Sequence, residues 1–270
     1  MNTKCLGLIA GNGKFPFLLA REAKANGYRI IAASIKGDTS IFLKFFVDKI
    51  SWFSAGELKN LFSYFQSQGV KEVIMAGQVN PSNLFDKNLE FDAEFKSLFQ
   101  AMQDRKADTI FLSVANKLKS YGIELLDSTF LLKKYLAPRG TLTKRAPTLN
   151  ELADIDFGKQ IAKTMGSIDV GQTVVVKERT IVAIEAMEGT DKTILRGGRI
   201  AREGAVIVKM SKPNQDLRFD VPVIGPRTIV HMRRANAKCL AIETGKTLII
   251  DRDKTIALAN KSDICIVAAS

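Results

Sequence analysis

Residues 4–34, KCLGLIAGNGKFPFLLAREAKANGYRIIAAS, decide the fold expected of the first half of the chain. The run 4–10 is continuously apolar, which is typical of a strand buried on both faces. A glycine turn over 11–13 follows, and 15–26 has the apolar period of a helix closed by a glycine. Residues 28–34 form a second apolar strand. This order of strand, glycine turn, helix and strand predicts the opening of a Rossmann-like parallel-sheet domain.

Further apolar runs and amphipathic stretches continue the same alternation up to residue 126. The predicted strands and helices are 47–53, 55–68, 72–76, 82–100, 104–121 and 123–126. Residues 136–148, LAPRGTLTKRAPT, then break the pattern with two prolines, a glycine and no apolar period, which is typical of a linker. We therefore expect a Rossmann-like nucleotide-binding domain over 1–135 and a C-terminal mixed α/β catalytic domain over 149–270.

The second half restarts with a predicted helix over 150–165, for which Asn150 is the expected N-cap. A hairpin follows over 171–186, with its turn at Arg179 and Thr180. The remaining predicted elements are helices 189–202, 226–237 and 253–260 and strands 205–210, 238–243, 247–251 and 264–268. The fold class is thus α/β in both halves.

The amino-acid composition says more about the binding partners of this protein than about its activity. Among 270 residues there are 40 Lys and Arg against 28 Asp and Glu, a net charge of +12. The excess is spread over both halves, so it is no basic tail, and it favours an anionic partner: nucleic acid, a phosphorylated small molecule or an acidic membrane surface. No apolar run approaches the ~20 residues that a membrane span needs.

The cysteines and the single histidine argue against several classes of site. Cys5, Cys239 and Cys265 show no CxxC spacing, which disfavours a disulfide framework and a zinc site. Each lies in an apolar run, as a core residue in a reducing cytoplasm would. His231 has no visible serine or cysteine partner motif, so a catalytic triad is not indicated.

Two glycine turns follow strands of the predicted parallel sheet. The first holds Gly11, Asn12 and Gly13, and the second holds Gly77 and Gln78. Backbone N–H groups at such turns can approach a phosphate, and turns at the carboxyl ends of parallel strands share one edge. The third glycine of the dinucleotide fingerprint is missing, as is an acid at the end of the second strand. An ordinary tight turn explains the glycines equally well.

Two polar stretches of the second half could also carry chemistry. Residues 185–191, EAMEGTD, set carboxylates around a glycine at a helix start, a pattern that suits either Mg²⁺ or a simple helix cap. Residues 208–226, VKMSKPNQDLRFDVPVIGP, leave an apolar strand as a charged, proline-bounded segment. Strand ends are where α/β proteins place their sites, although a solvated loop around an edge strand is the plainer interpretation.

Six motifs in series resemble one family, the magnesium-dependent UDP-2,3-diacylglucosamine pyrophosphatases of lipid A biosynthesis, the type unrelated to calcineurin-like phosphoesterases. The motifs are LGLIAGNGKFP, AGQVNP, DVGQ, VAIEAMEGTD, SKPNQDLRFDVPVIGP and LAIETGKTLIIDRD. The resemblance runs nearly end to end. The chain departs from it at Asn12, where many members have glycine, and at Ala107 and Thr109, which puts the role of 105–108 in question.

The resemblance implies a cytoplasmic enzyme that uses Mg²⁺ to cleave a nucleotide-sugar lipid to UMP and 2,3-diacylglucosamine 1-phosphate. Peripheral association of this enzyme with the inner membrane stays open. The family's essential aspartate falls on Asp220, as metal ligand or water-positioning base, with Asp191 as a second metal carboxylate. The substrate-binding candidates are Gly11, Asn12, Gly13, Gly77, Gln78, Gln172, Gly189, Thr190, Lys212 and Arg218.

Two other functions remain as alternatives to this one. Whether the protein forms a homodimer also stays open. One is a nucleotide- or dinucleotide-binding oxidoreductase, which the missing acid after the second strand disfavours. The other is a basic, non-enzymatic nucleic-acid-binding protein. The even spread of charge and the absence of a recognisable nucleic-acid-binding motif count against it, so we expect no nucleic-acid partner.

Overall fold

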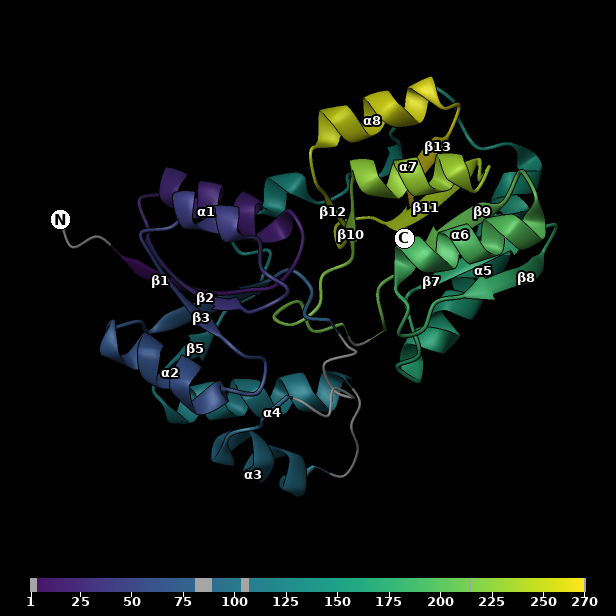
Figure 1. Ribbon diagram of the computed structural model, residues 1–270. Coiled ribbons are helices and arrows are strands. Elements are labelled where there is room, and N and C mark those ends of the chain that lie inside the picture. Colours follow the sequence, from purple (N-terminus) through teal and green to yellow (C-terminus); the bar gives the residue numbers. More distant parts are fainter. Residues whose placement is uncertain (1–3, 81–88, 103–106, 214, 270) are drawn as a thin grey trace. The chain divides into compact units, whose positions relative to one another are not determined.

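The computed structural model of the chain describes residues 4–80, 89–102, 107–213 and 215–269 (Figure 1). They form two compact units. The first comprises Met1–Leu132 together with Asp216–Asp220, and the second comprises Lys133–Gln215 and Val221–Ser270. Each unit has its own sheet and core, and the predicted α/β fold class is confirmed. These ranges differ from the expected ones of 1–135 and 149–270: the first unit ends at Leu132, residues 136–148 belong to the second unit, and Asp216–Asp220 pack with the first unit.

The first unit is built on a five-stranded parallel sheet of order β3-β2-β1-β4-β5. Its strands are β1 (Cys5–Ala10), β2 (Arg29–Ile35), β3 (Lys49–Phe53), β4 (Glu72–Ala76) and β5 (Glu124–Leu125). The strand order reverses between β1 and β4, and such a switch point is where open α/β sheets bind ligands.

Helices cover both faces of this sheet (Figure 1). The helical segments are α1 (Phe15–Ala25), η1 (Ile41–Phe45), α2 (Leu58–Ser67), α3 (Ala93–Ala101) and α4 (Ala107–Ser120). Helix α1 lies on one face, while α2 and α4 lie on the other, where Phe62, Phe65 and Leu118 are fully buried. The short helix η1 was not predicted, and residues 82–88 of the predicted helix 82–100 lie outside the described residues.

The second unit has a mixed six-stranded sheet of order β6-β13-β11-β9-β7-β8 and a parallel pair, β10 and β12. The strands are β6 (Gly140–Thr141), β7 (Thr173–Lys177), β8 (Thr180–Ile184), β9 (Val206–Lys209), β10 (Val223–Ile224), β11 (Cys239–Glu243), β12 (Leu248–Ile249) and β13 (Cys265–Ala269). Strands β9, β11 and β13 are parallel and fully apolar in their centres, as strands buried on both faces must be.

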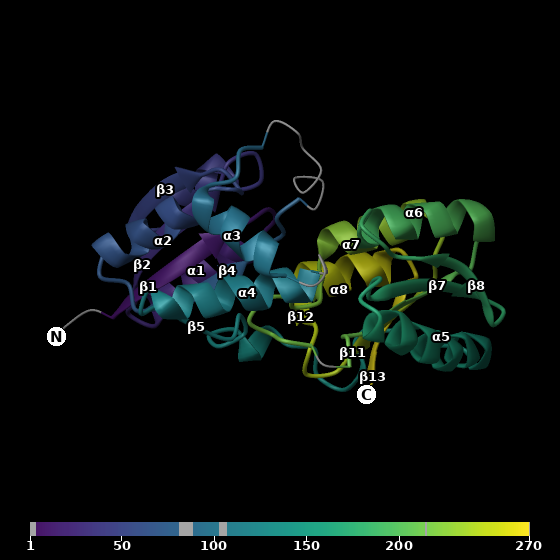
Figure 2. The same ribbon diagram turned by 90° about the horizontal axis from the view of Figure 1, so that it is seen from below.

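Helices again pack on both faces of this sheet. They are α5 (Leu149–Ser167), α6 (Thr190–Ala201), α7 (Pro226–Arg234) and α8 (Arg252–Lys261), and η3 (Lys133–Tyr135) precedes them. Figure 2 shows α5 on one side of the sheet and α6 and α7 on the other. Among the described residues, no helix is long and apolar enough to cross a membrane.

The N-terminus of α5 corrects the predicted cap. Thr148, not Asn150, is the N-cap: its Oγ1 accepts a hydrogen bond from the Glu151 N–H at 3.2 Å, while Glu151 Oε2 accepts one from the Thr148 N–H at 2.8 Å. This reciprocal capping box satisfies two N–H groups that the helix leaves without partners.

The β7–β8 hairpin also turns one residue earlier than predicted. Glu178 and Arg179 occupy the turn, both with positive φ (50° and 57°), as a two-residue hairpin turn requires. Asp154 of α5 accepts hydrogen bonds from both of their N–H groups, at 3.1 and 2.6 Å. A left-handed conformation costs free energy in non-glycine residues such as these two. The hydrogen bonds to the Asp154 carboxylate stabilise the turn against this cost.

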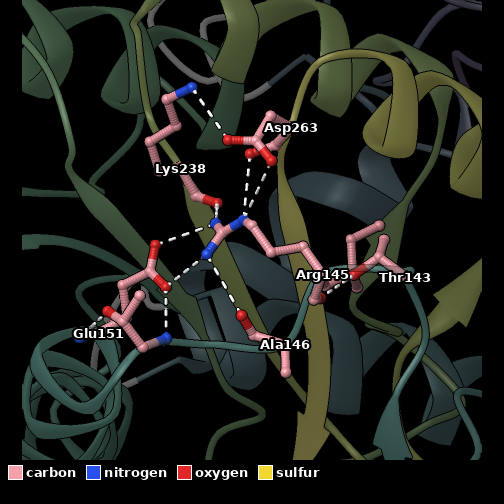
Figure 3. A network of polar contacts seen from close by, with 8 residues as sticks. Thr143, Arg145, Ala146, Glu151, Lys238 and Asp263 are labelled. Carbon is pink, nitrogen blue, oxygen red and sulfur yellow. Dashed lines mark hydrogen bonds and ion pairs between the residues drawn. The ribbon is translucent and has the colours of Figure 1, made fainter.

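Residues 136–148, the predicted linker, are fixed in the second unit by Arg145 (Figure 3). Its guanidinium donates to Glu151 at 2.7 and 3.0 Å and to the carbonyl oxygen of Lys238, and its Nε lies 3.6 Å from an Asp263 carboxylate oxygen. Lys238 directly precedes β11, and Asp263 lies two residues before β13. One arginine therefore joins the linker, α5 and two strands.

Candidate functional site

The two predicted glycine turns meet at the carboxyl edge of the first sheet, beyond β1 and β4. The Gly11 N–H donates to the Ala76 carbonyl at 2.9 Å, and Asn12 and Gln78 form an isolated bridge with bonds of 2.7 and 3.2 Å. The prediction that both turns share one edge is confirmed by these contacts.

Close approach of the two turns explains why glycines stand there. A Cβ on Gly11 would lie 2.6 Å from the Gln78 carbonyl oxygen, and one on Gly77 would lie 2.5 Å from that of Asn12. Gly77 also has φ of +89°, in the region that only glycine adopts freely. Gly13, by contrast, has φ of +96° and open space around its would-be Cβ. Turn-to-turn packing therefore accounts for Gly11 and Gly77, and Gly13 faces open space.

The first turn leads directly into the N-terminus of α1. That helix has no side-chain cap at Lys14 and no acid in its first turn, so no carboxylate of its own offsets the positive end of its dipole. The arrangement suits an approaching phosphate.

A third turn, after β2, completes this edge, and sequence reasoning missed it. Thr39 donates from Oγ1 to the Ala10 carbonyl and accepts from the Ile35 N–H at 2.9 Å. Asp38 accepts from the Asn80 N–H at 3.1 Å. An acid therefore does follow the second strand, but its carboxylate binds protein backbone.

Residues Asp216–Asp220, from the second half of the sequence, also lie at the carboxyl edge of the first sheet. The Ser128 N–H donates to the Leu217 carbonyl at 2.9 Å, and Ser128 Oγ lies within hydrogen-bond distance of the carbonyls of Met75 (2.7 Å) and Arg218 (3.0 Å). Phe219 stacks on Phe111 with ring centroids 5.8 Å apart. Asp220 is therefore held beyond the carboxyl ends of β4 and β5, and its N–H donates to the Asp216 carbonyl at 3.3 Å.

Arg218 is fixed by its neighbours in this segment. Its Nε lies 3.0 and 3.1 Å from the two carboxylate oxygens of Asp216, and its Nη2 lies 2.7 Å from one of them. The guanidinium also lies 4.9 Å from the centre of the Phe219 ring. These hydrogen bonds hold the pKa of the Asp216 carboxyl below its usual value and raise that of Arg218. The Arg218 guanidinium is therefore held by Asp216 and Phe219.

Three candidates of the second unit, Gly189, Thr190 and Asp191, lie at the start of α6. Thr190, the first residue of α6, donates to Glu185 at 2.9 Å and accepts from Lys209 Nζ at 2.7 Å. Lys209 ends β9 and is buried. Gly189, the N-cap, has φ of +80° and open space around its would-be Cβ. Glu185 and Lys209 lie in the two polar stretches 185–191 and 208–226, but neither was named as a site residue. The signal for Lys209 was a lysine that closes an apolar strand.

Asp191 lies in the same first turn of α6, and two side chains of α7 approach it. Arg227 Nε lies 2.7 Å from one oxygen, and His231 Nδ1 lies 3.2 Å from the other, although the second contact lacks the alignment of a hydrogen bond. His231 therefore faces a carboxylate.

Lys212 and Gln172 are both buried in the second unit. The Lys212 ammonium pairs with the Asp169 carboxylate, and the Lys212 N–H donates to Gln215 Oε1 at 2.7 Å. Gln172 precedes β7, and its carbonyl accepts from the Met210 N–H at 3.0 Å. The predicted site residues thus form two groups. One, in the first unit, holds Gly11, Asn12, Gly13, Gly77, Gln78, Arg218 and Asp220; the other, in the second, holds Gln172, Gly189, Thr190, Asp191 and Lys212.

Comparison with known proteins identifies the family of this chain. Residues 5–135 match the family model described as the LpxI N-terminal domain, and residues 138–267 match the LpxI C-terminal domain. The chain is also 31% identical over 266 residues to the UDP-2,3-diacylglucosamine pyrophosphatase LpxI of Caulobacter vibrioides, covering 94% of each protein. The chain belongs to the LpxI family.

Some solved structures show a distant likeness to this LpxI-family chain. An ADP complex of the N5-carboxyaminoimidazole ribonucleotide synthetase purK is 15% identical, with a TM-score of 0.28, over 64% of this chain and 32% of that one. A Hydrogenobacter thermophilus biotin carboxylase domain is 12% identical, with a TM-score of 0.28, over 73% and 41%. The chain spans less than half of either protein, and at these scores the likenesses carry no argument.

Proposed function

We propose that this protein hydrolyses the pyrophosphate bond of UDP-2,3-diacylglucosamine, giving UMP and 2,3-diacylglucosamine 1-phosphate in lipid A biosynthesis. The observation that carries the proposal is the 31% identity to the Caulobacter vibrioides enzyme over 94% of both chains, with both halves matched by LpxI family models. Neither an oxidoreductase nor a nucleic-acid-binding protein is favoured by these similarities.

Asp220 is the residue on which we place the chemistry. A water oxygen must attack one phosphorus while the bond from that phosphorus to the bridging oxygen breaks, and a positioned carboxylate can orient that water. Because the family's essential aspartate falls on Asp220, we assign it this role or that of a metal ligand. The packing of Phe219 and the contacts of Ser128 support a fixed position for it.

Mg²⁺ is the cofactor that we propose, and the donors present fit a site completed by substrate. Among the described residues, no group of three or more His, Cys, Asp or Glu side chains could hold a metal ion. Mg²⁺ is commonly bound through one or two carboxylates plus substrate phosphates, and Asp220 would supply one of them. The other carboxylate that the family resemblance suggests for the metal is Asp191, which contacts Arg227 and His231 within the second unit. The bound ion would offset negative charge on the pyrophosphate oxygens.

The cations Lys212 and Arg218 are proposed to bind the substrate phosphates. Each is paired with a carboxylate in this structure, Asp169 and Asp216 respectively, so each would exchange that partner for a phosphate oxygen. The N–H groups near Gly11, Asn12, Gly13, Gly77 and Gln78, and the polar groups of Gln172, Gly189 and Thr190, complete the proposed substrate contacts. We further propose a cytoplasmic enzyme that works at a membrane surface, with a homodimer as its assembly.

The decisive experiment incubates the protein with UDP-2,3-diacylglucosamine and Mg²⁺, with and without EDTA, and measures UMP. We expect release of UMP that EDTA abolishes. Asp220→Asn should lower the rate by about 100-fold or more, as loss of a group essential to the reaction does, without loss of folded structure by circular dichroism. Asp253→Asn, at an exposed carboxylate of α8, serves as the matched control.

Two outcomes would contradict these assignments. If wild-type protein releases no UMP, the proposed reaction is wrong. If Asp220→Asn hydrolyses at the wild-type rate, the reaction stands but the role of Asp220 does not. In ¹⁸O-labelled water, the label should enter 2,3-diacylglucosamine 1-phosphate, because the family resemblance favours attack at the sugar-side phosphorus.

A further inference from the structure

The connection from β2 to β3 exposes an unusual amount of apolar surface. Four of the six residues from Ile41 to Phe46 are large, apolar and exposed: Ile41 (62%), Phe42 (62%), Phe45 (70%) and Phe46 (40%). We call these four residues the aromatic patch. Single exposed apolar side chains are ordinary on a protein surface, but a contiguous group commonly marks an interaction site.

The aromatic patch is held in a defined conformation rather than on a loose loop. Ser40 caps η1 by accepting from the Phe42 N–H at 3.4 Å, and Leu43 is fully buried beneath it. Phe46 meets Phe17 of α1 edge to face, with ring centroids 5.1 Å apart. The fold therefore presents these side chains outward, next to α1, and little conformational freedom remains to be lost when a partner binds.

Positive charge surrounds the patch. Residues 14–49 contain seven Lys and Arg against three Asp and Glu. The Lys44 ammonium lies 5.0 Å from the centre of the Phe45 ring, and Lys14, Arg21 and Lys24 are exposed on the neighbouring helix α1. Aromatic rings beside lysine and arginine suit the interfacial zone of a bilayer, where rings enter the headgroup level and cations meet anionic lipids.

The patch is tied directly to the carboxyl edge of the first sheet. Asp38 and Thr39, just before η1, bind the Asn80 N–H and the Ala10 carbonyl. Asn80 lies in the turn that follows β4, and Ala10 is the last residue of β1. A surface that η1 contacts would therefore lie next to the candidate site within this unit.

We propose that the aromatic patch, with Lys44 and the cations of α1, docks this protein onto a bilayer that contains anionic lipids. The inference deepens the proposed function and rests on it, because a substrate with two acyl chains resides in a membrane. It assigns the membrane contact to one short helix. A second copy of this chain, the other kind of apolar partner, is an outcome of the test.

The test compares two double variants of the full-length protein in sedimentation with lipid vesicles. Phe42→Ser/Phe45→Ser removes the two rings of η1. Leu149→Ser/Ile200→Ser is the matched control, because these apolar residues are also largely exposed (84% and 63%) but belong to the second unit. The vesicles are phosphatidylcholine alone or phosphatidylcholine with phosphatidylglycerol.

We expect wild type and the control to bind the phosphatidylglycerol vesicles, with weaker binding at high salt. Phe42→Ser/Phe45→Ser should bind them about tenfold or more weakly, since two apolar rings no longer enter the interface. Its hydrolysis of substrate dispersed in detergent should stay at the wild-type rate. Failure of all three proteins to hydrolyse would count against the proposed function alone.

Equal binding by the two double variants would overturn the docking surface. So would a patch variant that binds vesicles as wild type does but sediments as a smaller species, because the patch would then join two copies of the chain. Loss of vesicle binding by the control alone would likewise place the contact on the second unit.

Discussion

Glu151 shows how much can depend on one carboxylate. It caps α5 and pairs with Arg145, which in turn binds the residues before β11 and β13. Burial alone would raise its pKa, but the hydrogen bonds from Arg145 and from the Thr148 N–H outweigh that effect, so the pKa lies below the usual 4.5. A carboxyl whose pKa is lower when folded contributes stability above its unfolded pKa and loses it as pH falls.

We therefore predict that Glu151→Gln lowers the free energy of unfolding by about 2 kcal/mol at pH 7, because the neutral amide loses the charge-assisted hydrogen bonds with Arg145. The difference should shrink as pH falls below about 4.5, where wild type also loses the charge. Urea unfolding followed by circular dichroism from pH 7 to pH 3.5 measures both effects. Asp156→Asn, exposed on the same helix, should change little; a gap independent of pH would contradict the role of the charge.

The β7–β8 hairpin gives a prediction for an element. Because Glu178 and Arg179 both have positive φ, replacing them with the residues that such turns prefer should relieve strain. Glu178→Asn/Arg179→Gly should raise the free energy of unfolding by about 1 kcal/mol. Asp154→Ala should lower it by about 1–3 kcal/mol, because two turn N–H groups lose their acceptor. Thermal unfolding of both variants measures this, and a shift in the same direction for both would contradict it.

The sequence predicted those elements that carry a local signal and missed those that depend on distant contacts. Apolar runs and glycine stops were enough for the buried strands and most helices. Strands β6 and β10 are two residues long and form only by pairing with β13 and β12. They are too short to show an apolar periodicity in the sequence. Helix η1 is exposed on most of its surface and therefore lacks an amphipathic pattern.

The candidate site likewise contains some contacts that the sequence predicted and others that it did not. The shared edge of the two glycine turns followed from parallel-sheet geometry, and the bridge between Asn12 and Gln78 agrees with it. Lys209 binding to Thr190 and the pairing of Asp191 with Arg227 could not be foreseen, because each joins residues 19 or more positions apart. The packing of Phe219 on Phe111 has no trace in the local sequence either.

At the scale of the whole molecule, the path of the chain matters most. The segment Asp216–Asp220 belongs to the first unit although the residues on both sides of it belong to the second. Phe219 packs against the core under α2 and α4, and Ser128 binds the backbone beside it. The first unit is therefore completed by the second half of the sequence.

This predicts that Phe219→Ala destabilises the first unit. Trp52 of β3 is the only tryptophan in the sequence, so its fluorescence reports on that unit. We expect its unfolding in urea to show a loss of about 1–3 kcal/mol, less than for a fully buried ring because Phe219 is half-buried. Phe130→Ala, with a ring that is 45% exposed, is the control. An unchanged Trp52 transition in Phe219→Ala would show that the segment adds no stability.

The return of Asp216–Asp220 to the first unit also has a consequence in time. Ser128 and Arg218, which are hydrogen-bonded, lie 90 positions apart. At about 5–20 residues per second, a ribosome adds the second roughly 5 to 18 seconds after the first. Throughout that interval the emerging sheet has Phe111 without its stacking partner and no Asp220 at its edge. The newborn chain thus acquires its proposed catalytic group only after most of the protein has been translated.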